Sequence, residues 1–173
     1  MQTHGRDLRF LFFFGLMMGV YYVSTTTTFA RETFFPSYLR LNARLAGGIL
    51  DVVGYDIAVR DQKVSEPRWS VTVGRGCDAV QPTALFVAAV LASPVPFLPR
   101  ICAAMVGTIA LAVINLLRII SLLLTGIYAP KLFDAMHLDV WQALFIFLAI
   151  LFWALWAAHY ARKRRAQTHD ESH

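Results

Sequence analysis

The chain has 173 residues and is rich in apolar side chains and poor in charge. Hydrophobic residues make up 57% of it, charged residues 16%, and the mean hydropathy is +0.54. This balance is too apolar for a soluble domain of this length and indicates an integral membrane protein. The net charge of +5 does not indicate nucleic-acid binding. The densest basic cluster, Arg162 to Arg165, directly follows the last apolar segment, where the cytoplasmic anchors of membrane helices lie.

Four apolar segments have the length of about 20 residues that a membrane-spanning helix needs. They cover residues 8–29, 77–98, 101–127 and 138–160. The first segment has a second interpretation as a cleaved signal peptide, because Arg6 and Arg9 precede a hydrophobic stretch and Thr28 to Ala30 is similar to a cleavage site. We expect a retained helix. The sequence thus predicts an all-α membrane protein, with residues 1–173 forming one domain of about four transmembrane helices.

The distribution of basic residues predicts the orientation of these helices. A basic tail, residues 161–173, adjoins a membrane end, whereas the basic residues of the long loop 31–76 are interleaved with acidic ones. Long loops also cross membranes largely regardless of their charge. We therefore expect both termini in the cytoplasm and the loop 31–76 on the extracytoplasmic side.

The loop 31–76 has periodic patterns of its own. Residues 38–53 carry an apolar stripe at helical spacing, which predicts an amphipathic helix in the membrane interface. Residues 57–59 and 69–73 alternate with period two on either side of a charged stretch, which predicts a small β-hairpin. The apolar stripe consists of Tyr38, Leu41, Leu45, Ile49 and Val52.

Cys77 follows two glycines, Gly74 and Gly76, which permit a tight or left-handed backbone just before the cysteine. Asp78 is a capping residue for the helix that follows. A thiol at a helix N-terminus has its thiolate stabilised by the helix dipole, so the pattern predicts a lowered pKa for Cys77. The alternative is a small apolar residue in a packing position. Cys102 begins the next apolar segment at the opposite membrane face, where we expect core packing and no disulfide to Cys77.

Arg118 lies inside an apolar segment, where a charged side chain is costly and usually faces a protein interior or a functional site. Asn115 lies three residues earlier on the same helical face. We expect both to face the bundle interior, with Asn115 supporting the arginine or contacting substrate. An arginine satisfied by helix-end carbonyls, or paired with Asp78 or Asp139, is the structural alternative.

His137 directly precedes the fourth segment, where a histidine by itself is more often a cap than a catalyst. The three residues Cys77, Arg118 and His137 belong to different segments and lie at one membrane rim. A thiol, a guanidinium and an imidazole at one depth are the parts of an acyl-transfer site, with nucleophile, oxyanion donor and general acid or base. The sequence has no CxxC and no His/Cys/carboxylate cluster, so we expect neither a metal nor another cofactor.

The chain resembles the exosortase and archaeosortase family of membrane transpeptidases. The resemblance covers roughly residues 38–160 and rests on Gly76 to Pro82, on Asn115 to Ile120, and on His137 ahead of a last helix that contains Trp141 and Gln142. Many family members have about eight helices, so this chain is similar to a short subtype, such as type H.

The resemblance implies that Cys77 is the nucleophile, Arg118 the stabilising arginine and His137 the acid and base. It implies cleavage of membrane-anchored substrate proteins at a C-terminal sorting signal, made of a short motif, a transmembrane helix and a basic tail. The implied location is the bacterial cytoplasmic (inner) membrane, with the site at the extracytoplasmic face. The alternative function is a noncatalytic membrane adaptor or assembly factor, whose polar residues only hold the helices together.

Overall fold

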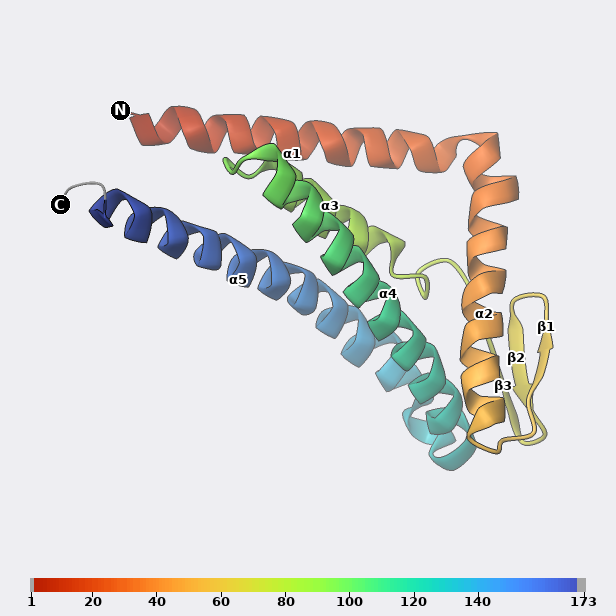
Figure 1. The fold of residues 1–173 in the computed structure, drawn as a ribbon. Helices are drawn as coiled ribbons and strands as arrows, with labels where there is room; N and C mark the ends of the chain where they lie inside the picture. Colours follow the sequence, from red (N-terminus) through yellow and green to blue (C-terminus); the bar gives the residue numbers. More distant parts are fainter. Residues whose placement is uncertain (1, 171–173) are drawn as a thin grey trace.

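The computed structural model describes residues 2–170, which form five α-helices and a three-stranded antiparallel sheet (Figure 1). A π-helical turn, Ala30–Phe34, connects the first two helices, and a second one, Ala135–Val140, leads into the last helix. The elements are α1 (Gln2–Thr26), α2 (Phe35–Val52), β1 (Ala58–Arg60), β2 (Lys63–Glu66), β3 (Trp69–Thr72), α3 (Val80–Ala92), α4 (Phe97–Tyr128) and α5 (Trp141–Asp170).

Three helical stretches are long and apolar enough to cross a membrane, namely Asp7–Thr26, Phe97–Tyr128 and Pro130–Lys163. They indicate a multi-pass membrane protein. The second predicted span, residues 77–98, is wrong, because α3 has 13 residues and is about 20 Å long. Ala79, with a φ of 53°, stands in a left-handed conformation before the helix, and a turn that contains Pro94 and Pro96 follows it. The apolar run therefore includes irregular backbone at both ends.

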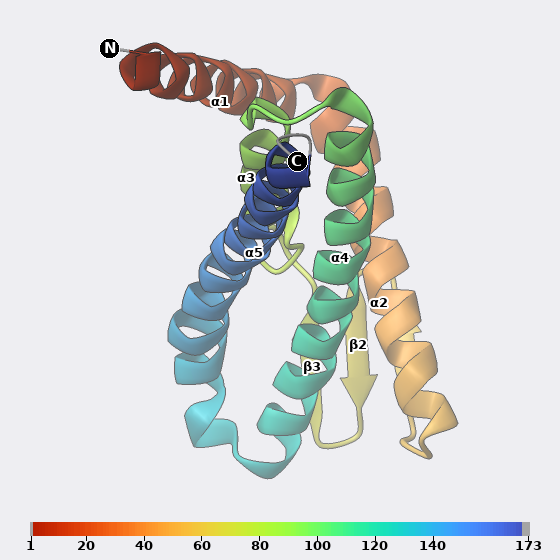
Figure 2. The ribbon, with the colours of Figure 1, turned by 60° about the vertical axis from the view of Figure 1, so that its left-hand side comes forward.

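The helices are arranged around α3, which packs against α1, α4 and α5 (Figures 1 and 2). The start of α1, the α3–α4 turn and the end of α5 lie toward one end of the molecule, which we call the termini end. The α4–α5 connection and the sheet lie toward the other, the sheet end. Gly107 lets α4 approach α3 closely, because a Cβ there would overlap the ring of Phe86.

The helix predicted for residues 38–53 is confirmed as α2, Phe35–Val52, which packs on α4 and on the sheet. Its buried face consists mainly of small and aliphatic residues such as Leu39, Ala43 and Leu50. The predicted apolar stripe lies on the opposite side, where Leu41 and Ile49 are exposed. That stripe is thus available to lipid, and the interfacial position of α2 stays a prediction.

The predicted β-hairpin is wrong in its pairing. Residues 57–59 and 69–73 do contribute strands, but both β1 and β3 pair with a central strand, β2, formed by the charged stretch between them. β2 carries one apolar side chain, Val64, which is fully buried against α2 and α4. A strand with a single buried residue has no alternating pattern long enough to detect.

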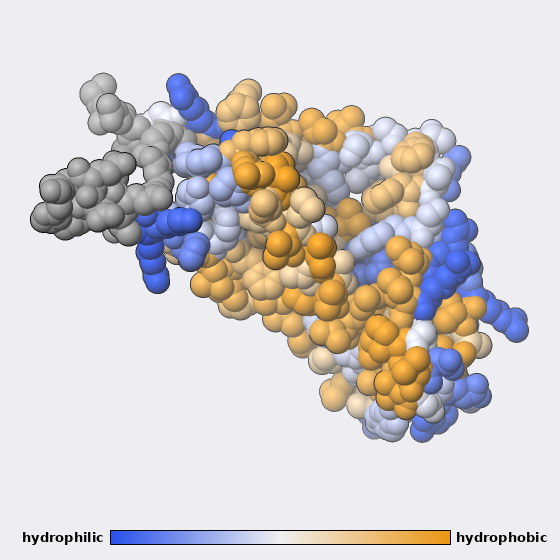
Figure 3. Space-filling view, in the orientation of Figure 1, coloured by the Kyte–Doolittle hydropathy of each residue, from blue (hydrophilic) through white to orange (hydrophobic). Residues whose placement is uncertain are grey.

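The face of the molecule in Figure 3 has apolar side chains over its middle and polar ones at both ends. Hydrophilic residues gather near the termini end and beside α2 and the sheet, and hydrophobic residues cover the helices between them. An apolar belt between two polar ends is the pattern expected for a membrane protein.

Candidate functional site

Cys77 lies in the turn that connects β3 to α3. Its backbone N–H donates to the carbonyl of Gly74 at 3.0 Å, and Gly76 has a φ of 93°, as the glycine pattern predicted. α3 begins only at Val80, whose N–H donates to Oδ1 of Asp78 at 3.2 Å. Cys77 therefore precedes the first turn of the helix, and Asp78 satisfies one of the free N–H groups at its start.

His137 faces Cys77 from the π-helical turn ahead of α5. The Cys77 Sγ lies 3.4 Å from Nδ1 and 3.6 Å from Nε2 of His137, within hydrogen-bond reach for sulfur. The imidazole stacks on Phe133, with centroids 5.7 Å apart and planes 7° apart, and Phe133 in turn contacts Trp69 of β3. Single π-helical turns are frequent at functional sites. This one holds the imidazole beside the thiol.

Arg118 of α4 is only 3% exposed and connects the cysteine turn to the histidine turn. Its Nη1 donates to the carbonyl of Gly76 at 3.1 Å, and its Nη2 to the carbonyl of His137 at 3.5 Å. The guanidinium also lies 5.5 Å from the centroid of the Phe145 ring. Its Nε is buried without a hydrogen-bond partner among the described residues. Arg118 thus holds both segments, and one of its three nitrogens, Nε, has no hydrogen-bond partner within residues 2–170.

Asn115 does not belong to this group. Its amide Nδ2 donates at 3.1 Å to Oδ1 of Asn42 on α2, and the amide of Asn42 donates to the Tyr38 carbonyl at 2.9 Å. Both asparagines are buried. The expectation that Asn115 supports the arginine is therefore wrong, because its amide links α4 to α2. Asn42 was missed, since the exposed leucine stripe of α2 dominated the sequence pattern.

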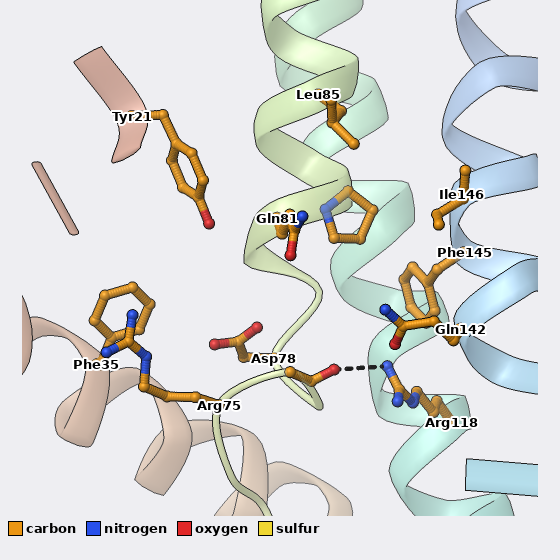
Figure 4. Close-up of a pocket in the computed structure, with 12 residues that line it drawn as sticks. Tyr21, Phe35, Arg75, Asp78, Gln81, Leu85, Arg118, Gln142, Phe145 and Ile146 are labelled. Carbon is orange, nitrogen blue, oxygen red and sulfur yellow. Dashed lines mark hydrogen bonds between the residues drawn. The ribbon is translucent and has the colours of Figure 1, made fainter. Parts of the chain in front are cut away.

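A pocket of about 270 Å³ lies beside Cys77, between α1, α3 and α5 (Figure 4). Gly76 and Asp78, the neighbours of Cys77, line it together with Arg118. The carboxylate of Asp78 faces into the pocket and is 5% exposed. Cys77 itself is turned toward His137. Further lining residues are Arg75, whose guanidinium lies over the Phe35 ring, and the amides Gln81 and Gln142.

Burial controls the charge of the thiol. Burial raises the pKa of Cys77 above its ordinary value, the nearby Arg118 guanidinium lowers it, and Asp78 raises it further. Burial also raises the pKa of Asp78, although backbone N–H groups and Arg75 oppose the shift. The lowered pKa predicted for Cys77 is therefore wrong, because the thiol lies outside the first turn of α3 and is only 6% exposed.

Because burial raises the pKa of Cys77, we expect this thiol to react slowly with alkylating reagents at neutral pH. A raised thiol pKa lowers the thiolate fraction at pH 7, and only the thiolate is nucleophilic. We expect iodoacetamide to alkylate Cys77 in a Cys102→Ala background more slowly than free cysteine at pH 7. The rate should rise with pH, with a midpoint above the ordinary thiol range near pH 8.5. Mass spectrometry at a series of pH values measures this. A midpoint below pH 7.5 would contradict the assignment of burial as the dominant cause.

Cys102 is exposed near the start of α4, so the core packing expected for it is wrong. Both Cys77 and Cys102 are free thiols. Arg162 and Lys163 are part of α5, which continues to Asp170, whereas the last three residues of the predicted tail lie outside the described residues.

Within residues 2–170, no group of three or more His, Cys, Asp or Glu side chains is arranged to hold a metal ion.

Comparisons with protein families, with curated proteins and with solved structures give no match for this chain.

Proposed function

We propose that the protein is a membrane-embedded cysteine transpeptidase or protease that cleaves a C-terminal sorting signal of exported proteins. The observation that carries the proposal is the Cys77 Sγ at 3.4 Å from His137 Nδ1, beside a buried arginine that bonds to both segments. A nucleophile within hydrogen-bond reach of a base is the arrangement that covalent catalysis requires. Residues separated by 60 positions in the chain meet here.

The first half-reaction forms a thioester. His137 takes the proton of the Cys77 thiol, and the resulting thiolate attacks the carbonyl carbon of the scissile peptide bond. The imidazolium then gives its proton to the leaving nitrogen as the carbon–nitrogen bond breaks. The N-terminal part of the substrate remains on sulfur, and the C-terminal part leaves as an amine. Because burial raises the pKa of Cys77, a base within hydrogen-bond reach favours formation of the thiolate.

The second half-reaction releases the substrate. A water molecule or an acceptor amine gives a proton to His137 and attacks the thioester carbon. The carbon–sulfur bond breaks, and the thiolate recovers the proton. Arg118 lines the pocket and stabilises the negative oxygen in both halves, because its guanidinium has N–H donors beyond the two that bond to the backbone carbonyls. Removal of a single donor of this kind typically costs about 10² to 10³ in rate.

The membrane position of the site supports a membrane-anchored substrate. Arg118 is 21 positions after the start of α4, which corresponds to about 31 Å of helix, close to the thickness of a hydrocarbon core. A substrate held by its own transmembrane helix would present the polar segment that precedes this helix at the same depth. We assign the protein to the bacterial inner membrane, with both termini in the cytoplasm and the site at the extracytoplasmic face, and we place it with the exosortase and archaeosortase family on its motifs.

The orientation can be tested directly. A phosphatase reporter that is active only outside the cytoplasm, fused after His173, should be inactive, because the basic end of α5 stays in the cytoplasm. The same reporter inserted at Gly54, in the exposed turn after α2, should be active. The opposite pattern would place Cys77 at the cytoplasmic face and overturn the proposed route of exported substrates to the site.

The function is tested by co-expression. An exported reporter protein from the same genome that ends in a short motif, an apolar helix and a basic tail should be shortened when it is co-produced with the wild-type chain. Immunoblotting and mass spectrometry of the new C-terminus measure the cleavage. An unchanged reporter across all such tails of the genome would contradict the proposal.

The second candidate is the noncatalytic adaptor. The observation that favours it is the bonding of Arg118 to two backbone carbonyls, because a purely structural arginine would make the same contacts. The adaptor requires no thiol at position 77, so the cysteine variants discussed below separate the two functions.

A further inference from the structure

A groove between α1 and α5 continues from the pocket beside Cys77 toward the termini end. α3 forms its floor, and both α1 and α5 pack against α3 (Figure 1). The groove has a volume of about 320 Å³, and it shares Leu85 and Ile146 with the pocket that Arg118 and Asp78 line. Near the termini end, the rings of Phe10 and Trp153 lie 5.9 Å apart and bridge the two walls.

The groove and the pocket differ sharply in chemistry. The groove is lined by apolar side chains. Besides Phe10 and Trp153, they include Phe14 of α1, Leu85 and Ala89 of α3, and Ile146 and Ala149 of α5. Two of the lining residues, Ala89 and Ala149, are small, and small residues allow another helix to approach closely, as at interfaces between membrane helices. The pocket at its end offers a buried carboxylate, a buried guanidinium and two amides.

The dimensions fit one segment of a membrane helix. From Gln142 beside the pocket to Trp153 at the bridge, α5 rises about 16 Å, roughly half the thickness of a hydrocarbon core. If an apolar helix lies in this groove, the chain segment that adjoins the helix enters the polar pocket beside Cys77. The pocket offers this segment hydrogen-bonding groups. A lipid chain would fill the apolar part of the groove, but it has no donors or acceptors to offer the carboxylate of Asp78 or the amides of Gln81 and Gln142 in the pocket.

We propose that this groove holds the transmembrane helix of the substrate, and that Asp78, Gln81 and Gln142 bind the polar peptide segment that adjoins this helix. The inference rests on the proposed function and assigns its substrate-binding surface. α1 is then one wall of the substrate site. Gln81 and Gln142 offer both donors and acceptors to an extended backbone, and the Asp78 carboxyl accepts from a peptide N–H.

Cross-linking tests the groove without catalysis. The probe is a synthetic peptide with ten polar residues, twenty Leu and Ala residues and four lysines, which carries one cysteine in the first turn of its helix. It is added to liposomes that contain the full chain with Cys77→Ala and Cys102→Ala and one new cysteine. The new cysteine replaces Ile146 in the groove or, as the matched control, Val113 on α4. Both positions are half-exposed, at 45% and 52%.

We expect the disulfide yield at position 146 to exceed that at position 113 at least five-fold. Equal yields would mean that the groove holds bulk lipid, and disulfides between two copies at position 146 that exclude the peptide would mean a dimer interface. Either result overturns the inference. Because the variant lacks both native thiols, this readout is independent of whether the protein is an enzyme.

A processing assay gives the second readout. Ile146→Trp fills the groove and should raise the substrate concentration for half-maximal processing about ten-fold with little change in maximal rate, whereas Val113→Trp should change neither. If the pocket binds the polar segment that adjoins the substrate helix, Gln81→Ala should also raise the substrate concentration for half-maximal processing. Normal processing by Ile146→Trp would overturn the placement of the helix but leave the role of Cys77 intact.

Discussion

Replacement of Cys77 by alanine is expected to abolish processing of a tail-bearing substrate while the protein accumulates at its normal level. The substitution removes the sulfur that lies 3.4 Å from His137 and leaves the Cβ, so packing in the turn changes little. Without a nucleophile no thioester forms, and processing should fall below detection. Immunoblots of substrate and of the membrane protein measure the two quantities in the same cells.

Cys102→Ala is the matched control. The second free cysteine has the same chemistry but is exposed near the start of α4, whereas Cys77 is buried at the site. Removal of the Cys102 thiol should leave processing unchanged. If the Cys77→Ala protein processed substrate at the wild-type rate, the enzyme proposal would be wrong and the adaptor would take its place.

Arg118→Lys should lower the processing rate about 10²-fold or more, although the charge is kept. The arginine donates to the carbonyls of Gly76 and His137 from two nitrogens, and its planar guanidinium has further N–H groups. A lysine has a single nitrogen and cannot reproduce this planar array. Processing kinetics in membranes with equal amounts of each variant provide the measurement.

Arg100→Lys is the control for an arginine that only supports the fold. Its Nη1 donates to the Leu91 carbonyl at 2.7 Å, near the α3–α4 turn and far along α4 from the site. It should retain most of the processing rate. Equal effects of the two substitutions, or loss of the Arg118→Lys protein from the membrane, would favour a structural role for Arg118.

The site was predictable from the sequence to the extent that polar residues are rare in apolar segments. Arg118 stands out because a charge in a spanning helix must find partners, and Cys77 stands out through its glycines. The structure brings both beside His137. Their roles stay predictions. The pKa of Cys77 was not predictable, because the start of α3 depends on the left-handed Ala79 and on burial by other segments.

The fold was less predictable in the segment between α1 and α3. From hydropathy alone, residues 77–98 were predicted to be a full span. Hydropathy carries no information on the irregular backbone before Val80 and after Ala92. The sheet depends on Val64, whose burial comes from contact with α2 and α4. The pairing of Asn115 with Asn42 joins residues 73 positions apart, and no local pattern signals such a contact.

The most direct test of the central claim is the mass of the enzyme during turnover. The wild-type chain is mixed with a tail-bearing substrate, quenched in acid, and analysed intact and after digestion. We predict an adduct with the mass of the N-terminal substrate fragment less one water, located on Cys77, absent from Cys102 and removed by neutral hydroxylamine. Cleaved substrate without an adduct on Cys77 at any time, or an adduct that resists hydroxylamine, would contradict a thioester mechanism at this site.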